Sequence, residues 1–112
     1  VNPAGVIGQI NGGVAQGIGW TLYESLLFKD GIPQCNGLHQ YTLMTMKDMP
    51  AIESILVETN DPTGPFGAKG IGEPTLIPTG PAIANAIEDA IGVRIKDLPI
   101  TPEKIYRALY KK

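Results

Sequence analysis

A helical pattern that carries five glycines constrains the start of the chain more than any other feature. Its apolar side chains fall on one stripe at helical spacing over residues 7–28: Val14, Ile18, Leu22 and Leu26. The glycines in the same pattern are Gly8, Gly12, Gly13, Gly17 and Gly19. Each glycine inside a helix costs about 1 kcal/mol relative to alanine. This helix therefore requires a neighbouring helix, sheet or ligand that approaches its backbone closely.

Charge and cysteine content exclude several classes of function. The 112 residues include 9 Lys and Arg against 11 Asp and Glu, a formal net charge of −2. This balance, without a basic run, argues against nucleic acid or an acidic membrane as the main partner. The single Cys35 excludes an internal disulfide and any iron–sulfur or zinc site built from the chain's own thiols. No stretch reaches the roughly 18 consecutive apolar residues of a membrane span, so we expect a cytoplasmic protein.

The chain begins at Val1 without a methionine. No basic segment precedes an apolar one, so we expect that the first residues are not a signal peptide. We therefore expect the sequence to start within a longer protein, as a fragment or as the product of a split gene. We treat residues 1–112 as one portion of a larger domain.

The remaining periodic segments predict an α+β fold. Alternating apolar residues predict strands over residues 38–46 and 52–59, and a short strand over 93–95. Thr79-Gly80-Pro81 opens a helix that Gly92 ends, and Thr101-Pro102-Glu103 opens the last helix. We expect helices packed on a small mixed or antiparallel sheet.

A glycine-rich loop over residues 60–74 ends in Glu73-Pro74 and leads into the apolar run 75–78. Loops of this length are usually functional or disordered. A carboxylate beside apolar atoms loses hydration and becomes a better base. The alternative is a glutamate placed near a helix start because the helix dipole favours it there. Lys69 could pair with Glu73 or hold a phosphate, although neither a Walker motif nor a complete dinucleotide fingerprint is present.

Two amides accompany the glycines of the first helix. Gln9 and Gln16 are seven residues apart, two helical turns, so they share a face. Such amides suit a polar heterocycle as donors and acceptors, while capping or helix–helix hydrogen bonding is the alternative. His39 has no partner at metal-ligand spacing, so we assign no metal ligand.

Two glycine signatures carry a resemblance to a known family. Residues 8–19, Gly-Gln-Ile-Asn-Gly-Gly-Val-Ala-Gln-Gly-Ile-Gly, resemble the first signature of the xanthine dehydrogenase/aldehyde oxidase family. Residues 67–74, Gly-Ala-Lys-Gly-Ile-Gly-Glu-Pro, look like its second signature, and residues 81–87 and 98–103 are also similar. The chain thus resembles the C-terminal part of that family's molybdopterin-binding subunit.

The resemblance implies a reaction and its cofactors. Family members hydroxylate a carbon beside a heteroatom, or an aldehyde carbon, with oxygen from water. Their cofactor is molybdenum held by molybdopterin, often as the cytosine dinucleotide in bacteria. Electrons leave through two 2Fe–2S clusters and commonly FAD, on partner domains or subunits. The implied partners are the remainder of the molybdenum subunit, an iron–sulfur subunit, in some members a FAD subunit, and a small-molecule substrate, in an oligomeric enzyme.

The resemblance also implies roles for individual residues. Glu73 matches the general base of the second signature, and Gln9 matches a glutamine near the cofactor. Gln16 is a further cofactor-binding candidate, as are Gly70, Ile71 and Gly72, a glycine-rich stretch whose backbone can approach the cofactor. Asn11 departs from the commoner glutamate of the first signature.

The family's molybdenum subunit is several times longer than this chain, and its upstream segments hold most of the pterin and select the substrate. We therefore expect the chain alone to bind no cofactor stably and to have no turnover. Xanthine, another purine, nicotinate or an aldehyde all remain open as substrates. Two alternatives are a non-catalytic binding or assembly module that keeps the fold, and a phosphate-binding domain that uses Lys69.

Overall fold

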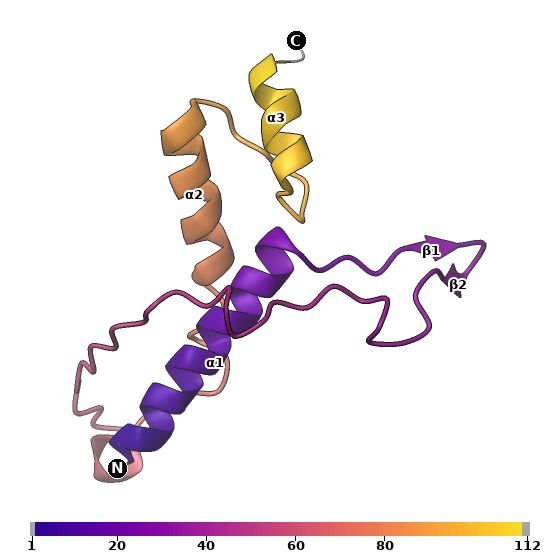
Figure 1. Cartoon of the computed structure of the whole chain (residues 1–112). Coiled ribbons are helices and arrows are strands. Elements are labelled where there is room, and N and C mark those ends of the chain that lie inside the picture. The colour runs from indigo at the N-terminus through magenta and orange to yellow at the C-terminus, as the bar shows by residue number, and fades with distance from the viewer. Residues whose placement is uncertain (1, 111–112) are drawn as a thin grey trace.

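Three α-helices, joined largely by extended chain, form the part of the protein that the computed structural model describes, residues 2–110 (Figure 1). Two very short strands and one turn of 3₁₀-helix complete it. In chain order the elements are α1 (Pro3–Leu22), β1 (Phe28–Lys29), β2 (Ile32–Pro33), η1 (Pro65–Gly67), α2 (Thr79–Ile91) and α3 (Pro102–Tyr110). The α+β class with a small antiparallel sheet is confirmed.

The glycine-rich helix α1 starts and stops at identifiable hydrogen bonds. The Asn2 side chain accepts the Gly5 N–H at 3.0 Å, and Pro3 occupies the first turn, where its missing N–H costs nothing. The helix ends at Leu22 because the N–H groups of Tyr23 and Glu24 both donate to the carbonyl of Gly19. The predicted bounds, residues 7–28, were therefore wrong at both ends. At the C-terminal end the apolar stripe continues to Leu26, beyond the last helical hydrogen bond.

The sheet is a single hairpin whose turn is Asp30-Gly31. Phe28 pairs with Pro33 and Lys29 with Ile32. Both turn residues have positive φ, 51° for Asp30 and 76° for Gly31, as a tight two-residue hairpin turn requires. The hairpin extends away from the three helices (Figure 1).

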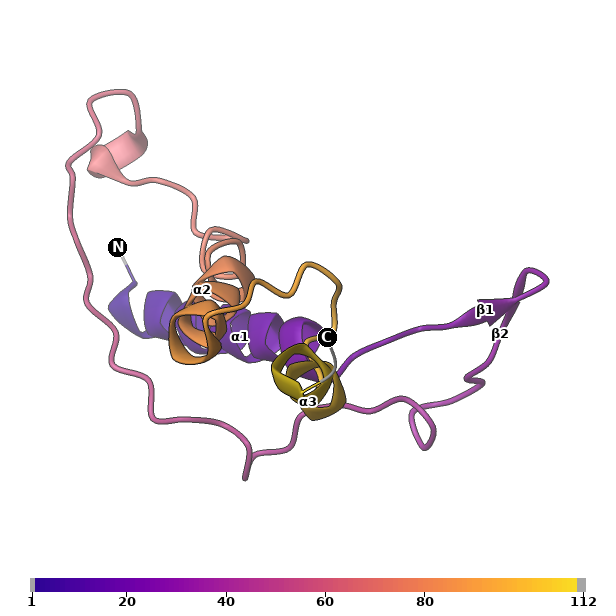
Figure 2. The same ribbon diagram turned by 90° about the horizontal axis from the view of Figure 1, so that it is seen from above.

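The strands predicted over residues 38–46, 52–59 and 93–95 were wrong in position. None of these segments pairs with another described segment. Residues 38–48 instead contain two turns, at residues 38–40 and 46–48, and residues 51–60 continue as irregular chain that runs past the helices (Figure 2). Ile55 and Val57, two apolar residues of the segment 52–59, are each 79% exposed. The apolar alternation in this segment therefore does not correspond to a face that is buried by the described residues.

Glycines of α1 let the segment before α2 approach the helix backbone. A Cβ atom added at Gly17 would lie 2.5 Å from Cβ of Thr79, well inside van der Waals contact. This confirms that the first helix needs a close neighbour, and the neighbour is the start of α2. Gly92 ends α2 in the left-handed conformation, with φ of 70°, and α3 begins at Pro102, both as predicted.

The buried core is very small. Ile100 and Thr21 are each 1% exposed, and the Ile100 N–H donates to the Thr21 carbonyl at 2.6 Å. This contact joins the end of α1 to the chain before α3. The radius of gyration is 17.6 Å, whereas a compact chain of this length has one of about 13 Å. No helix among the described residues is long and apolar enough to cross a membrane.

Candidate functional site

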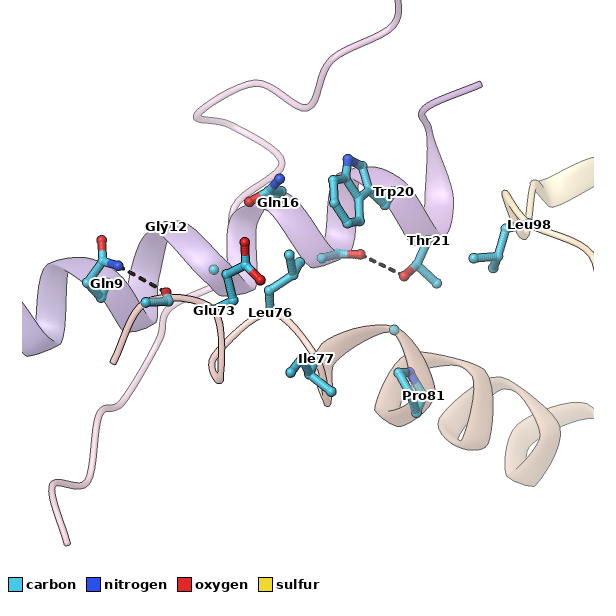
Figure 3. A pocket seen from close by; sticks show the side chains of 14 residues that line it. Gln9, Gly12, Gln16, Trp20, Thr21, Glu73, Leu76, Ile77, Pro81 and Leu98 are labelled. Atoms are coloured by element: carbon cyan, nitrogen blue, oxygen red, sulfur yellow. Dashed lines mark hydrogen bonds between the residues drawn. The ribbon is translucent and has the colours of Figure 1, made fainter. Parts of the chain in front are cut away.

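A groove of about 690 Å³ lies between α1 and the turn that leads into α2 (Figure 3). We call it the α1 groove. Its α1 side carries Gln9 and Gln16 of the first glycine signature, and its opposite side carries Gly72 and Glu73 of the second signature. The residues that matter for its chemistry are Gln9, Gln16, Trp20, Gly72, Glu73 and Leu76.

Glu73 stands at the start of a tight turn on the edge of the α1 groove. The Leu76 N–H donates to the Glu73 carbonyl at 2.9 Å and closes this turn. The Glu73 side chain points into the groove toward α1 (Figure 3). Leu76 and Ile77 line the same groove as Glu73. Glu73 itself is exposed, because no described residue covers it.

Lys69 does not pair with Glu73. The ion pairs among the described residues join Arg94 to Glu88 and Arg107 to Glu103. Lys69 lies instead near Asp61, whose pKa is lowered mainly by hydrogen bonds from Thr63, with a smaller effect from the Lys69 charge. The Glu73 carboxylate therefore has no cationic partner within the described part of the chain.

Gln9 connects α1 to the glycine loop just before Glu73. Its Nε2 donates to the carbonyl oxygens of Ile71, at 3.2 Å, and Gly72, at 3.0 Å. An amide NH₂ has two donors, so both of them are used here and Oε1 remains as an acceptor. Sequence reasoning found Gln9 but not this contact, which spans more than sixty residues of chain.

The other candidate residues divide between two cavities. Gln16 lines the α1 groove together with Gln9, which confirms their shared face, and its amide makes no hydrogen bond to another described residue. Gly72 lines the same groove. Gly70 and Ile71 line a second cavity of about 700 Å³, which also includes Gln9. Gln9 thus stands between the two cavities.

The α1 groove suits an organic polar cofactor better than a bare metal ion. Within residues 2–110, no three His, Cys, Asp or Glu side chains gather in a way that could hold a metal. The groove does offer a carboxylate and two amides. The positions of Gly12 and Gly72 open onto space, since a Cβ added at either would meet nothing within 4 Å. A planar ligand could therefore approach the backbone there, and any metal would have to arrive on that ligand.

Comparison with known proteins gives the class of this domain. The model of a family described as a molybdopterin cofactor-binding domain matches residues 1–50. The putative xanthine dehydrogenase molybdenum-binding subunit of Escherichia coli K12 is 41% identical over 112 residues, covering 98% of this chain and 15% of the relative. The gamma subunit of the 6-hydroxypseudooxynicotine dehydrogenase complex of Paenarthrobacter nicotinovorans is 44% identical over 110 residues, covering 95% and 14%.

Solved structures agree with this match. Quinoline 2-oxidoreductase from Pseudomonas putida 86 superimposes with a TM-score of 0.90 and 38% identity, over 100% of this chain and 15% of that one. The Cu,Mo-CO dehydrogenase shares the fold, with a TM-score of 0.85 and 24% identity over 96% of this chain and 14% of that one.

The fold, the relatives and the family match over residues 1–50 define part of a molybdopterin cofactor-binding domain. The chain is homologous to a C-terminal portion of the molybdenum-binding subunits of the xanthine dehydrogenase/aldehyde oxidase family, which confirms the resemblance drawn from the two glycine signatures. It spans about 15% of the length of these relatives.

Proposed function

We propose that residues 1–112 form the C-terminal portion of the molybdenum subunit of a molybdenum hydroxylase. In this proposal the chain supplies the general base, Glu73, and one wall of the cofactor site. The observation that carries it is the α1 groove, which brings Gln9 and Gln16 of the first signature to the same cavity as Glu73 of the second. Residues from two distant signatures thus share one small volume.

The molybdenum cofactor, when bound, would supply the two-electron redox centre of the hydroxylation. The chain's part is to hold and move a proton. The Glu73 carboxylate accepts a proton from the water-derived oxygen, so that this oxygen can attack the substrate carbon. The absence of a cationic partner among the described residues leaves both carboxylate oxygens available for this proton.

The neighbours of Glu73 would hold the cofactor. Gln9 contributes the Oε1 acceptor that its loop contacts leave available, and Gln16 contributes a complete amide. Gly72 offers open backbone in the α1 groove, while Gly70 and Ile71 offer it in the cavity beyond Gln9. The cofactor is molybdopterin, in its plain or cytosine dinucleotide form.

The remainder of the molybdenum subunit is the first partner in this proposal. The expanded shape supports it, because the whole chain superimposes on a segment of quinoline 2-oxidoreductase with a TM-score of 0.90. An open conformation shared with a segment of a much longer chain is one that other polypeptide covers. Iron–sulfur and FAD subunits in an oligomeric, cytoplasmic enzyme complete the proposal. The relatives named for xanthine and quinoline favour a nitrogen heterocycle as substrate over an aldehyde.

A non-catalytic assembly module is the second candidate. The many exposed apolar side chains favour it as well, since they suit docking whether or not chemistry follows; they include Leu38, Met46 and Phe66. The two candidates differ in whether turnover depends on Glu73.

Molybdenum content tests whether the chain is one wall of a shared site. We expect the chain purified alone to retain no molybdenum, because it has no cluster of metal ligands among its described residues and its groove is open to solvent. Co-expressed with the remainder of a molybdenum subunit, it should be recovered in a complex that contains molybdenum by elemental mass spectrometry. Hydroxylase activity from the chain alone after incubation with molybdenum cofactor would contradict this proposal.

A further inference from the structure

A hydrogen bond from Thr75 connects the turn that contains Glu73 to the glycine-rich helix α1. The Thr75 hydroxyl donates to the backbone carbonyl of Gln9 in α1 at 3.0 Å. The two residues are 66 positions apart in the chain. Neither the periodicity nor the two signatures singles out Thr75, which lies one residue beyond the second signature.

Gly13 makes the room for this contact. A Cβ atom added at Gly13 would lie 2.8 Å from Cβ of Thr75, closer than real side chains pack. The Gln9 carbonyl has a second lone pair beyond the one that its helical hydrogen bond uses, so it can accept the Thr75 hydroxyl as well. The hydrogen bond from Thr75 to Gln9 therefore depends on both the Thr75 hydroxyl and the lack of a side chain at Gly13.

The contact lies within the turn that Glu73 begins. The Leu76 N–H bonds to the Glu73 carbonyl, so Glu73 and Thr75 belong to the same tight turn. On the other side of Glu73, the Gln9 side chain holds the carbonyls of Ile71 and Gly72. Hydrogen bonds to Gln9 of α1 therefore hold the chain on both sides of Glu73. Loss of the bond on either side would let the Glu73 carboxylate move.

We propose that Thr75 is a positioning residue for Glu73, holding its carboxylate over the α1 groove through the hydrogen bond to Gln9. This inference rests on the proposed role of Glu73 as the base. Without this hydrogen bond the turn is more mobile, so the Glu73 carboxylate occupies its catalytic position for less of the time. Misplacement of a catalytic group by about 1 Å can lower the rate up to about a hundredfold. We expect the loss to fall on kcat, because Thr75 is not among the residues that line the α1 groove.

The test compares Thr75→Val, which removes the hydroxyl, with Thr75→Ser, which keeps it, in the assembled holoenzyme. Thr63→Val is a matched control, since the Thr63 hydroxyl bonds only Asp61 in the loop away from the groove. We expect Thr75→Val to lower kcat about tenfold or more with unchanged KM and molybdenum content. Amide hydrogen exchange over residues 71–76 should become faster. Thr75→Ser should restore both properties, and Thr63→Val should change neither.

Equal kcat and equal exchange in Thr75→Val and Thr75→Ser would overturn the inference. If Thr75→Val fails to assemble because its added methyl group meets Gly13, Thr75→Ala removes the hydroxyl without adding atoms there, and the same two outcomes apply. Exchange over residues 71–76 does not depend on turnover, so it reports on the contact even if Glu73 is not the base. Retained turnover in Glu73→Gln refutes the proposed function and with it the expected effect of Thr75 on kcat, whereas unchanged exchange in the Thr75 variants refutes the inference alone.

Discussion

Glu73→Gln should abolish most of the turnover of the assembled enzyme while leaving its molybdenum in place. Glutamine keeps the size and shape of the side chain that lines the α1 groove, but an amide cannot accept the proton. General-base catalysis contributes about 10²–10⁴-fold, so we expect kcat to fall by roughly that factor. Steady-state kinetics and elemental analysis of the same preparation give both readings.

Glu53→Gln is the matched control for this experiment. It makes the same chemical change at an exposed glutamate that does not line the groove, and it should leave kcat unchanged. If Glu73→Gln turns over at the parent rate, Glu73 is not the base and the assembly-module alternative gains ground. A loss of molybdenum together with turnover would assign Glu73 to cofactor binding instead.

The second large effect concerns the glycines of α1. Alanine at both Gly13 and Gly17 should destabilise the chain, because the added Cβ atoms would meet Thr75 and Thr79. Overpacking costs about 1–3 kcal/mol at each site, which exceeds the roughly 1 kcal/mol that alanine gains in helix propensity. Urea unfolding followed by far-ultraviolet circular dichroism measures the change in free energy of unfolding.

Alanine at Gly8 and Gly12 is the control for the glycine experiment. A Cβ at either position meets nothing within 4 Å, so helix propensity alone applies and the chain should gain up to about 2 kcal/mol. The two double variants are thus expected to shift stability in opposite directions. A shift in the same direction would show that close approach by residues 75–79 is not what requires Gly13 and Gly17.

Local signals in the sequence located the ends of two helices and the need for a close neighbour along α1. Gly92 and Thr101-Pro102 set boundaries within a few residues of themselves, so they could be recognised without tertiary structure. The predicted strands failed for a physical reason. Alternation at residues 52–59 reports which side chains need burial, but a strand also requires a partner, and no described segment supplies one.

The candidate site was predictable only in part. Glu73 and Gln9 came from the resemblance of the two signatures, and the seven-residue spacing placed Gln16 on the face of Gln9. The hydrogen bonds from Gln9 to Ile71 and Gly72, and from Thr75 to Gln9, join residues more than sixty positions apart. Such contacts depend on the path by which residues 60–74 come back beside α1. Neither the periodicity nor the composition of the sequence indicates that path.

An experimental structure of the assembled holoenzyme with its molybdenum cofactor tests the central claim most directly. We predict that the Glu73 carboxylate stands beside the molybdenum ligands, in a groove that the remainder of the subunit closes, with Gln9 and Gln16 next to the cofactor. A carboxylate that faces bulk water, away from the molybdenum, would contradict the role proposed for Glu73 and for the groove that carries it.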